Sequence, residues 1–243
     1  MKIVHPSELM REAAAVLEPV RDDVVIIGAA AVQVALDGHD VALTPTRDID
    51  AGVKTAAVQR VVNQLEASGL VRSDIPHEHS FTWVKGELKV QLLRPFDPFA
   101  KGSAKGLPES NIVSELDRHR VAVAFDDRPD TIRFWAASAG ALIGLKEAAF
   151  GRTRPDGEPV DRDFSDAAML LERLVDEITT ELADPSPMRG RAVRAAERLL
   201  TDEASKAAAR ELINSGEHDT QRGAELAVRR AAQSFLRRIC THS

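Results

Sequence analysis

The chain contains the segment Val24-Val25-Ile26-Ile27-Gly28-Ala29, and Thr46-Arg47-Asp48-Ile49-Asp50 follows after a short span of helical composition. Four β-branched apolar residues that end at a glycine predict a buried strand, which turns sharply into a helix from near Ala30. In the second piece, the alternation of polar and apolar residues predicts an edge strand. Ile49 would then point into the core, and Asp48 and Asp50 would share the opposite face.

These two pieces together indicate a site for a phosphorylated ligand. Backbone N–H groups at a turn into a helix can bind phosphate. Two carboxylates on one strand face can share Mg²⁺, which proteins usually hold with one or two carboxylates plus the phosphates of a substrate. The sequence therefore predicts a nucleoside triphosphate site. The alternative for an isolated Asp-x-Asp is a solvated turn or strand end.

The order of strand, glycine turn, helix and Asp-x-Asp resembles the polymerase β-type nucleotidyltransferase superfamily. The Arg47-Asp48-Ile49-Asp50 spelling is similar to the AbiEii/MenT-type toxin nucleotidyltransferases. The resemblance implies an α+β fold, with a polymerase β-like mixed sheet and helices followed by a helical C-terminal lobe. It also implies an enzyme of class EC 2.7.7, with Mg²⁺ held by Asp48 and Asp50. Gly28, Ala29 and Arg47 would bind the nucleotide; Ala29 stands where the family usually has Gly or Ser.

A hairpin is predicted where residues 81–84 and 88–93 flank the turn Lys85-Gly86, and a second where 121–125 and 131–134 flank an Asp/Pro-rich turn. In the resembled fold, the last strand of the first hairpin carries a third carboxylate. Gln91 stands at that position here, unless the alignment is shifted by two residues. An amide oxygen can ligate Mg²⁺ or hold a ribose, but it cannot accept a proton as a general base.

Lys146 lies on the apolar stripe of a helix predicted from Ala139 to Ala149, together with Leu142. Two readings are open for it. The side chain can snorkel at the end of the helix, or its ammonium group can contact the triphosphate through a charge-assisted hydrogen bond.

The residues that follow resemble the later motifs of the same toxin family. The resemblance implies that Lys146 contacts nucleotide phosphates and that Asp163 belongs to the active site. Arg152 and Asp166 are further nucleotide-binding candidates. From the residues alone, Asp163 and Asp166 also fit the acidic first turn of a helix beginning near Asp163, which the helix dipole favours.

Length and composition limit the class of partner, the compartment and the number of domains. The chain has 243 residues and a formal net charge of −6, which argues against general coating of nucleic acid. A single cysteine, Cys240, excludes an intrachain disulfide framework. The sequence has no apolar run that would span a membrane and no secretory leader, which predicts a cytoplasmic protein. We expect a core over residues 1–136 and a helical domain over residues 137–243, the latter with arginine-rich faces on its last helices.

The expected partners are an NTP, a tRNA 3′ end as the acceptor and, because the resembled family consists of toxins, a cognate antitoxin. Two alternatives stay open. The acceptor could be a small molecule or a protein side chain, or the chain could be a nucleotide-binding module without catalysis. Ala29 and Gln91 favour the second of these alternatives.

Overall fold

The computed structural model describes residues 1–5, 7–41, 46, 48–73, 81–93, 115–126, 128, 131–150 and 161–241. The chain divides into two compact units. The first unit comprises Met1–Asp37 and Pro45–Ser138, and the second comprises Gly38–Thr44 and Ala139–Ser243. Arg47 and Arg152 lie outside the described residues.

The first unit is built on an eight-stranded mixed sheet of order β1-β7-β8-β2-β3-β6-β5-β4. The strands are β1 (Lys2–Ile3), β2 (Val24–Ile27), β3 (Ile49–Val53), β4 (Val71–Arg72), β5 (Thr82–Lys85), β6 (Leu88–Leu93), β7 (Arg120–Ala124) and β8 (Arg133–Ala137). Both predicted hairpins are confirmed, as antiparallel β5–β6 and β7–β8.

The prediction of an edge strand at Asp48–Asp50 is wrong, because β3 lies inside the sheet between β2 and β6. β3 pairs antiparallel with β2 and parallel with β6. An interior strand can carry Asp50 because this residue sits at its beginning, opposite the last residue of β2, where the neighbouring backbone turns away. The four other residues of β3 are buried.

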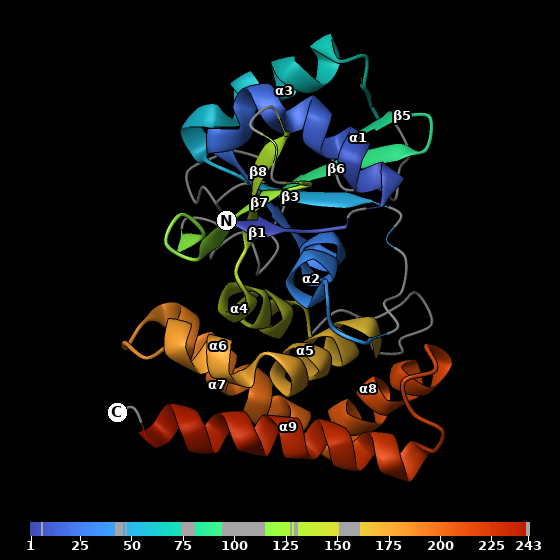
Figure 1. The fold of residues 1–243 in the computed structure, drawn as a ribbon, viewed down its shortest axis with the longest axis vertical. Coiled ribbons are helices and arrows are strands. Elements are labelled where there is room, and N and C mark those ends of the chain that lie inside the picture. Colours follow the sequence, from blue (N-terminus) through green and yellow to red (C-terminus); the bar gives the residue numbers. More distant parts are fainter. Residues whose placement is uncertain are drawn as a thin grey trace, which may run out of the picture. The chain divides into compact units, whose positions relative to one another are not determined.

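Helices cover the sheet of the first unit on both faces, with α1 and α3 on one face and α2 on the other (Figure 1). Helix α1 (Glu8–Leu17) begins at Ser7, whose side chain accepts a hydrogen bond from the Met10 N–H. The others are α2 (Gly28–Leu36), α3 (Val58–Ala67) and the short 3₁₀ segments η1 (Glu18–Asp23) and η2 (Thr55–Ala57). The alternating apolar residues of β6 are buried, which leaves Lys89 and Gln91 on its other face.

The second unit is helical in its described residues. It contains α4 (Ala139–Ala149), α5 (Asp161–Arg173), α6 (Val175–Glu181), α7 (Pro187–Leu199), α8 (Asp202–Asn214) and α9 (Gln221–Thr241). The predicted α+β class is therefore confirmed, although α5 begins two residues before the predicted start at Asp163. Among the helices of the described ranges, none combines the length and the apolar character needed to cross a membrane.

Candidate functional site

The turn between β2 and α2 requires glycine for two separate reasons. Gly28 has a φ of +65°, a conformation that side chains with a Cβ rarely adopt. A Cβ built on Gly28 would also lie 2.1 Å from Oδ2 of Asp50. The carboxylate of Asp50 therefore rests directly against the backbone at the start of α2. Ala29 follows in the first turn of the same helix, so its backbone belongs to the helix N-terminus.

Strand pairing places three predicted site residues side by side across the sheet. Asp50 pairs with Ile27 of β2 on one side and with Gln91 of β6 on the other. Side chains of directly paired residues point to the same face, about 5 Å apart. Gln91 is therefore the immediate neighbour of Asp50 on this face, and Lys89 and Leu93, two residues away on the same strand, are not.

Asp48 immediately precedes β3 and is half-buried, as is Asp50. Ile49 between them is 0% exposed. The hydroxyl of Thr46 donates a hydrogen bond to the backbone oxygen of Asp48 at 2.8 Å and lies 3.5 Å from its Oδ1. This contact holds the backbone of Asp48 in place just before the strand begins.

The donor set at this strand end fits Mg²⁺ completed by phosphates. Asp48 and Asp50 supply hard, anionic oxygens, and Gln91 adds an amide oxygen beside them. In the described ranges, no three or more histidine, cysteine, aspartate or glutamate side chains gather as a metal-binding group. Mg²⁺ is commonly held by only one or two carboxylates when the substrate brings its own phosphates. The pair is therefore more typical of a substrate-completed site than of a closed metal cage.

Sequence reasoning missed Lys89, which shares the face of β6 that carries Gln91. Because β3 and β6 run parallel, Lys89 precedes Gln91 as Asp48 precedes Asp50. A half-buried lysine on the face of β6 that carries Gln91 can bind a phosphate oxygen. The signal was present in the alternation of Leu88-Lys89-Val90-Gln91, which puts both polar residues on one face.

The second group of predicted residues forms a buried ion cluster inside the helical unit. Nζ of Lys146 on α4 donates to Oδ1 of Asp163 at 2.8 Å and to Oδ2 of Asp166 at 2.6 Å, both on α5. All three residues are at most 8% exposed. The snorkelling reading of Lys146 is therefore wrong, because its ammonium group ends between two carboxylates and not in solvent.

Burial and charge act against each other on Lys146. Burial alone would lower its pKa, because the charged form loses its water. The carboxylates of Asp166 and Asp163 outweigh that effect and raise the pKa above its ordinary value. Lys146 is therefore a permanent cation at neutral pH, and the cluster of one lysine and two aspartates is suited to hold charge in place.

Further contacts fix both helices of this cluster. Asp161, at the first position of α5, accepts two hydrogen bonds at 2.9 Å from Arg210 of α8. Glu147, next to Lys146, accepts from Arg191 at 2.9 Å and from Arg194 at 3.1 Å, both on α7. The acidic first turn of α5 is thus paired with basic side chains of two other helices, beyond any effect of the helix dipole.

The described site residues therefore form two groups, one in each unit. The first group contains Gly28, Asp48, Asp50 and Gln91, with Ala29 after the glycine. The second contains Lys146, Asp163 and Asp166.

No family model matches this sequence, and no curated protein matches it. Among solved structures, the chain is similar to a crystal structure of a proposed nucleotidyltransferase from H. pylori. The two are 14% identical over 98% of this chain and 99% of that chain, with a TM-score of 0.44.

Proposed function

We propose that this chain is a Mg²⁺-dependent nucleotidyltransferase that moves a nucleotidyl group from an NTP to an acceptor hydroxyl. The observation that carries the proposal is the contact between the Gly28 backbone and the Asp50 carboxylate, with Gln91 directly beside it. A backbone turn at a helix N-terminus and a metal-binding carboxylate thereby meet at one point. Phosphate binding needs the first, and metal binding needs the second.

In this proposal, Asp48 and Asp50 would hold Mg²⁺, which when bound would supply positive charge beside the reacting phosphate of the NTP. The turn at Gly28 and Ala29 binds phosphate oxygens through backbone N–H groups. Arg47, Arg152, Lys146 and Asp166 are the further nucleotide-binding candidates, by resemblance. Gln91 contributes a neutral amide, which can hold a ribose hydroxyl.

The reaction conserves all atoms of its two substrates. The acceptor oxygen forms a bond to the α-phosphorus, and the bond from that phosphorus to the oxygen bridging to the β-phosphate breaks. Pyrophosphate leaves, and the acceptor proton passes to Asp50 or to solvent. Asp163 is a further active-site candidate, by resemblance, and its carboxylate accepts a hydrogen bond from Lys146. Gln91 takes no part in proton transfer, because an amide is not a base.

We further propose a tRNA 3′ end as the acceptor and a cognate antitoxin as a regulatory partner. The support for both is the resemblance of the Arg47–Asp50 and Lys146–Asp166 segments to AbiEii/MenT-type toxins. One observation favours a second candidate function, a nucleotide-binding module without catalysis. Gln91 lies beside Asp50, and by resemblance this is the position where the fold usually carries a third carboxylate.

One experiment separates these possibilities. The purified chain is incubated with Mg²⁺ and each NTP in turn, labelled on either the α- or the γ-phosphate, against total RNA, protein and small-molecule pools. Nucleotidyl transfer to RNA predicts that the α-label enters RNA and the γ-label does not. Transfer of the γ-label would overturn the reaction type, and α-label in another pool would overturn the RNA acceptor. Tight NTP binding with no transfer to any pool would support the non-catalytic module.

A further inference from the structure

The last helix, α9, is basic, although the chain as a whole is acidic. It carries five arginines and a single acidic residue, Glu225, although the whole chain has a formal net charge of −6. Its inner face is buried through residues such as Val228, Phe235 and Ile239. The arginines lie on the remaining faces, and they differ in whether they form ion pairs within the helical unit.

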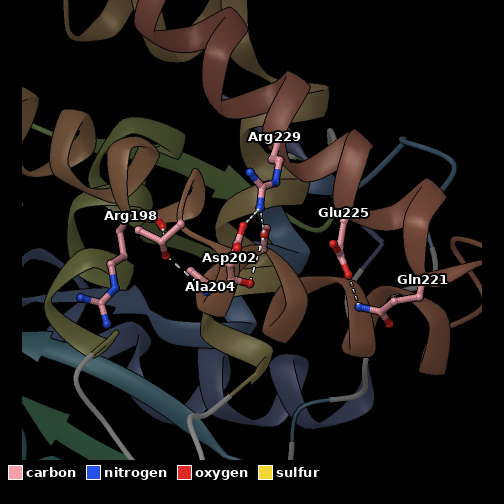
Figure 2. A network of polar contacts seen from close by, with 8 residues as sticks. Arg198, Asp202, Ala204, Gln221, Glu225 and Arg229 are labelled. Carbon is pink, nitrogen blue, oxygen red and sulfur yellow. Dashed lines mark hydrogen bonds and ion pairs between the residues drawn. The ribbon is translucent and has the colours of Figure 1, made fainter.

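Two of the five arginines are used inside the helical unit. Figure 2 shows Arg229 reaching from α9 to Asp202 of α8, where it forms an ion pair and also bonds the Ser205 hydroxyl at 3.1 Å. The hydrogen bond from Arg229 lowers the pKa of Asp202 below its usual value. Arg238 forms an ion pair with Asp176 of α6. These two guanidinium groups are therefore committed to packing α9.

The other three arginines lie along the outer face. At 100° per residue, Arg222, Arg230 and Arg237 fall within one stripe directly opposite the buried face. All three are exposed, and the described part of the chain contains no acidic partner for them. Arg237 donates to the Gln233 backbone oxygen at 3.3 Å. Glu225 lies to the side of the stripe, where it accepts from Gln221 at 2.8 Å (Figure 2).

The spacing of the stripe suits an extended anionic partner. With a rise of 1.5 Å per residue, Arg222 and Arg230 are about 12 Å apart along the axis, and Arg230 and Arg237 about 10 Å. Leu226, 45% exposed, lies between the first two and offers apolar surface to a base or a ribose. Guanidinium groups bind phosphates through paired hydrogen bonds and also stack on bases.

We infer that the stripe Arg222–Leu226–Arg230–Arg237 on α9 binds the phosphodiester backbone of RNA. This inference rests on the proposed function, which it deepens by assigning a surface to an acceptor polynucleotide. RNA is favoured over an acidic protein because evenly spaced arginines without interleaved acids match a repeating phosphate backbone. The interaction is with phosphates, so it recognises the class of polymer and not a base sequence.

The test measures binding without NTP or Mg²⁺, so that its result is independent of catalysis. The full chain is titrated against a fluorescein-labelled RNA oligonucleotide by anisotropy over a series of salt concentrations. The variant Arg222→Gln/Arg230→Gln/Arg237→Gln should bind about tenfold to a hundredfold more weakly at about 0.1 M salt. The slope of log affinity against log salt should fall by about 2, because each lost phosphate contact in a single strand accounts for about 0.7.

The matched control removes three positive charges from another part of the molecule. Arg21, Arg60 and Arg128 each pair with an acid on the first unit, so Arg21→Gln/Arg60→Gln/Arg128→Gln should leave RNA affinity within about twofold. Equal losses in the two triple variants would overturn the proposal in favour of a net-charge effect. Displacement of RNA by polyglutamate at matched charge concentration would also overturn it, in favour of an acidic protein.

A second readout uses Cys240, the single cysteine of the sequence, which is exposed three residues beyond Arg237 on the same stripe. A photo-crosslinker attached there should capture RNA in the otherwise wild-type chain and lose most of that yield in the stripe variant. Crosslinking that is unchanged in the stripe variant would contradict the inference. If RNA binds at the stripe but no α-label is transferred, the inference stands and the proposed function fails.

Discussion

The two groups of carboxylates in this molecule differ in burial and in their contact with a lysine. Asp48 and Asp50 sit half-buried at the start of a strand, one resting against a glycine backbone. Asp163 and Asp166 are buried in a helical unit and tied to the ammonium group of Lys146. A half-exposed carboxylate keeps part of its hydration, whereas a buried one must be paired to be tolerated. The first pair therefore keeps contact with solvent, whereas the second pair is enclosed together with a lysine.

The largest expected effect concerns the first pair. Replacing Asp48 or Asp50 with Ala should lower nucleotidyl transfer by at least about a thousandfold, because metal-assisted stabilisation is worth several kcal/mol. The thermal midpoint should stay within about 2 °C, since neither carboxylate is buried. Asp184→Ala, at an exposed position between α6 and α7, is the control and should leave both quantities unchanged. Near-wild-type transfer in both single variants would refute the metal assignment.

The second pair should differ from the first by responding in stability as well, because its carboxylates are buried. Lys146→Met leaves two buried carboxylates without their cation, so the free energy of unfolding in urea should fall by about 3–5 kcal/mol. Lys146→Met/Asp163→Leu/Asp166→Leu removes the whole cluster and should recover most of that loss. If the free energy of unfolding of Lys146→Met stays within about 1 kcal/mol of the wild-type value, the cluster does not stabilise the packing of the helices.

Part of this contrast could be predicted from the sequence and part could not. The glycine turn and the Asp-x-Asp alternation are local patterns, so their place on a strand end was readable from neighbouring residues. Lys146 stood out as a cation on an apolar stripe, but its partners are 17 and 20 residues away and become visible only once α4 packs on α5. The interior place of β3 was missed because its pairing with β6 is non-local.

A smaller effect is expected at Gly28. There the cost of a positive φ can be separated from the cost of a Cβ clash with Asp50. Gly28→Ala should lower the free energy of unfolding by about 2–3 kcal/mol and transfer by more than tenfold, because its Cβ would displace the Asp50 carboxylate. Gly86 has a similar φ of +57° but no atom within 4 Å of its hypothetical Cβ. Gly86→Ala should therefore cost only about 1 kcal/mol and keep full activity. Equal behaviour of the two variants would remove the special role of Gly28.

The pH dependence of stability sharpens the contrast further. Because the pKa of Lys146 is raised in the folded state, its contribution is complete below the unfolded pKa of about 10.4 and is lost as pH rises through the folded pKa. Above about pH 10.4, wild-type stability should fall by about 1.4 kcal/mol per pH unit more steeply than that of the Lys146→Met/Asp163→Leu/Asp166→Leu variant. Parallel alkaline unfolding curves would show that Lys146 is not held as a cation.

The smallest effect is expected at Gln91. Gln91→Ala should keep transfer within about tenfold, since the amide supplies no proton acceptor. Gln91→Glu places a third carboxylate beside Asp50, so the Mg²⁺ concentration needed for half-maximal activity should fall. The measurement is a Mg²⁺ titration of transfer for the three chains. Complete loss of activity in folded Gln91→Ala would show that this amide is indispensable.

The first turn of α5 also has a consequence for local motion. Asp161 is tied to α8, whereas Asp163 and Asp166 are tied to α4, so the helix start is anchored in two directions. Helix ends usually fray with little free-energy cost, and their amides then exchange quickly with solvent deuterium. In α5, the amides of Ser165 to Met169 should instead be protected, and they should exchange only when the whole helical unit unfolds. In this unit, a segment near a helix terminus should therefore be among the last to open.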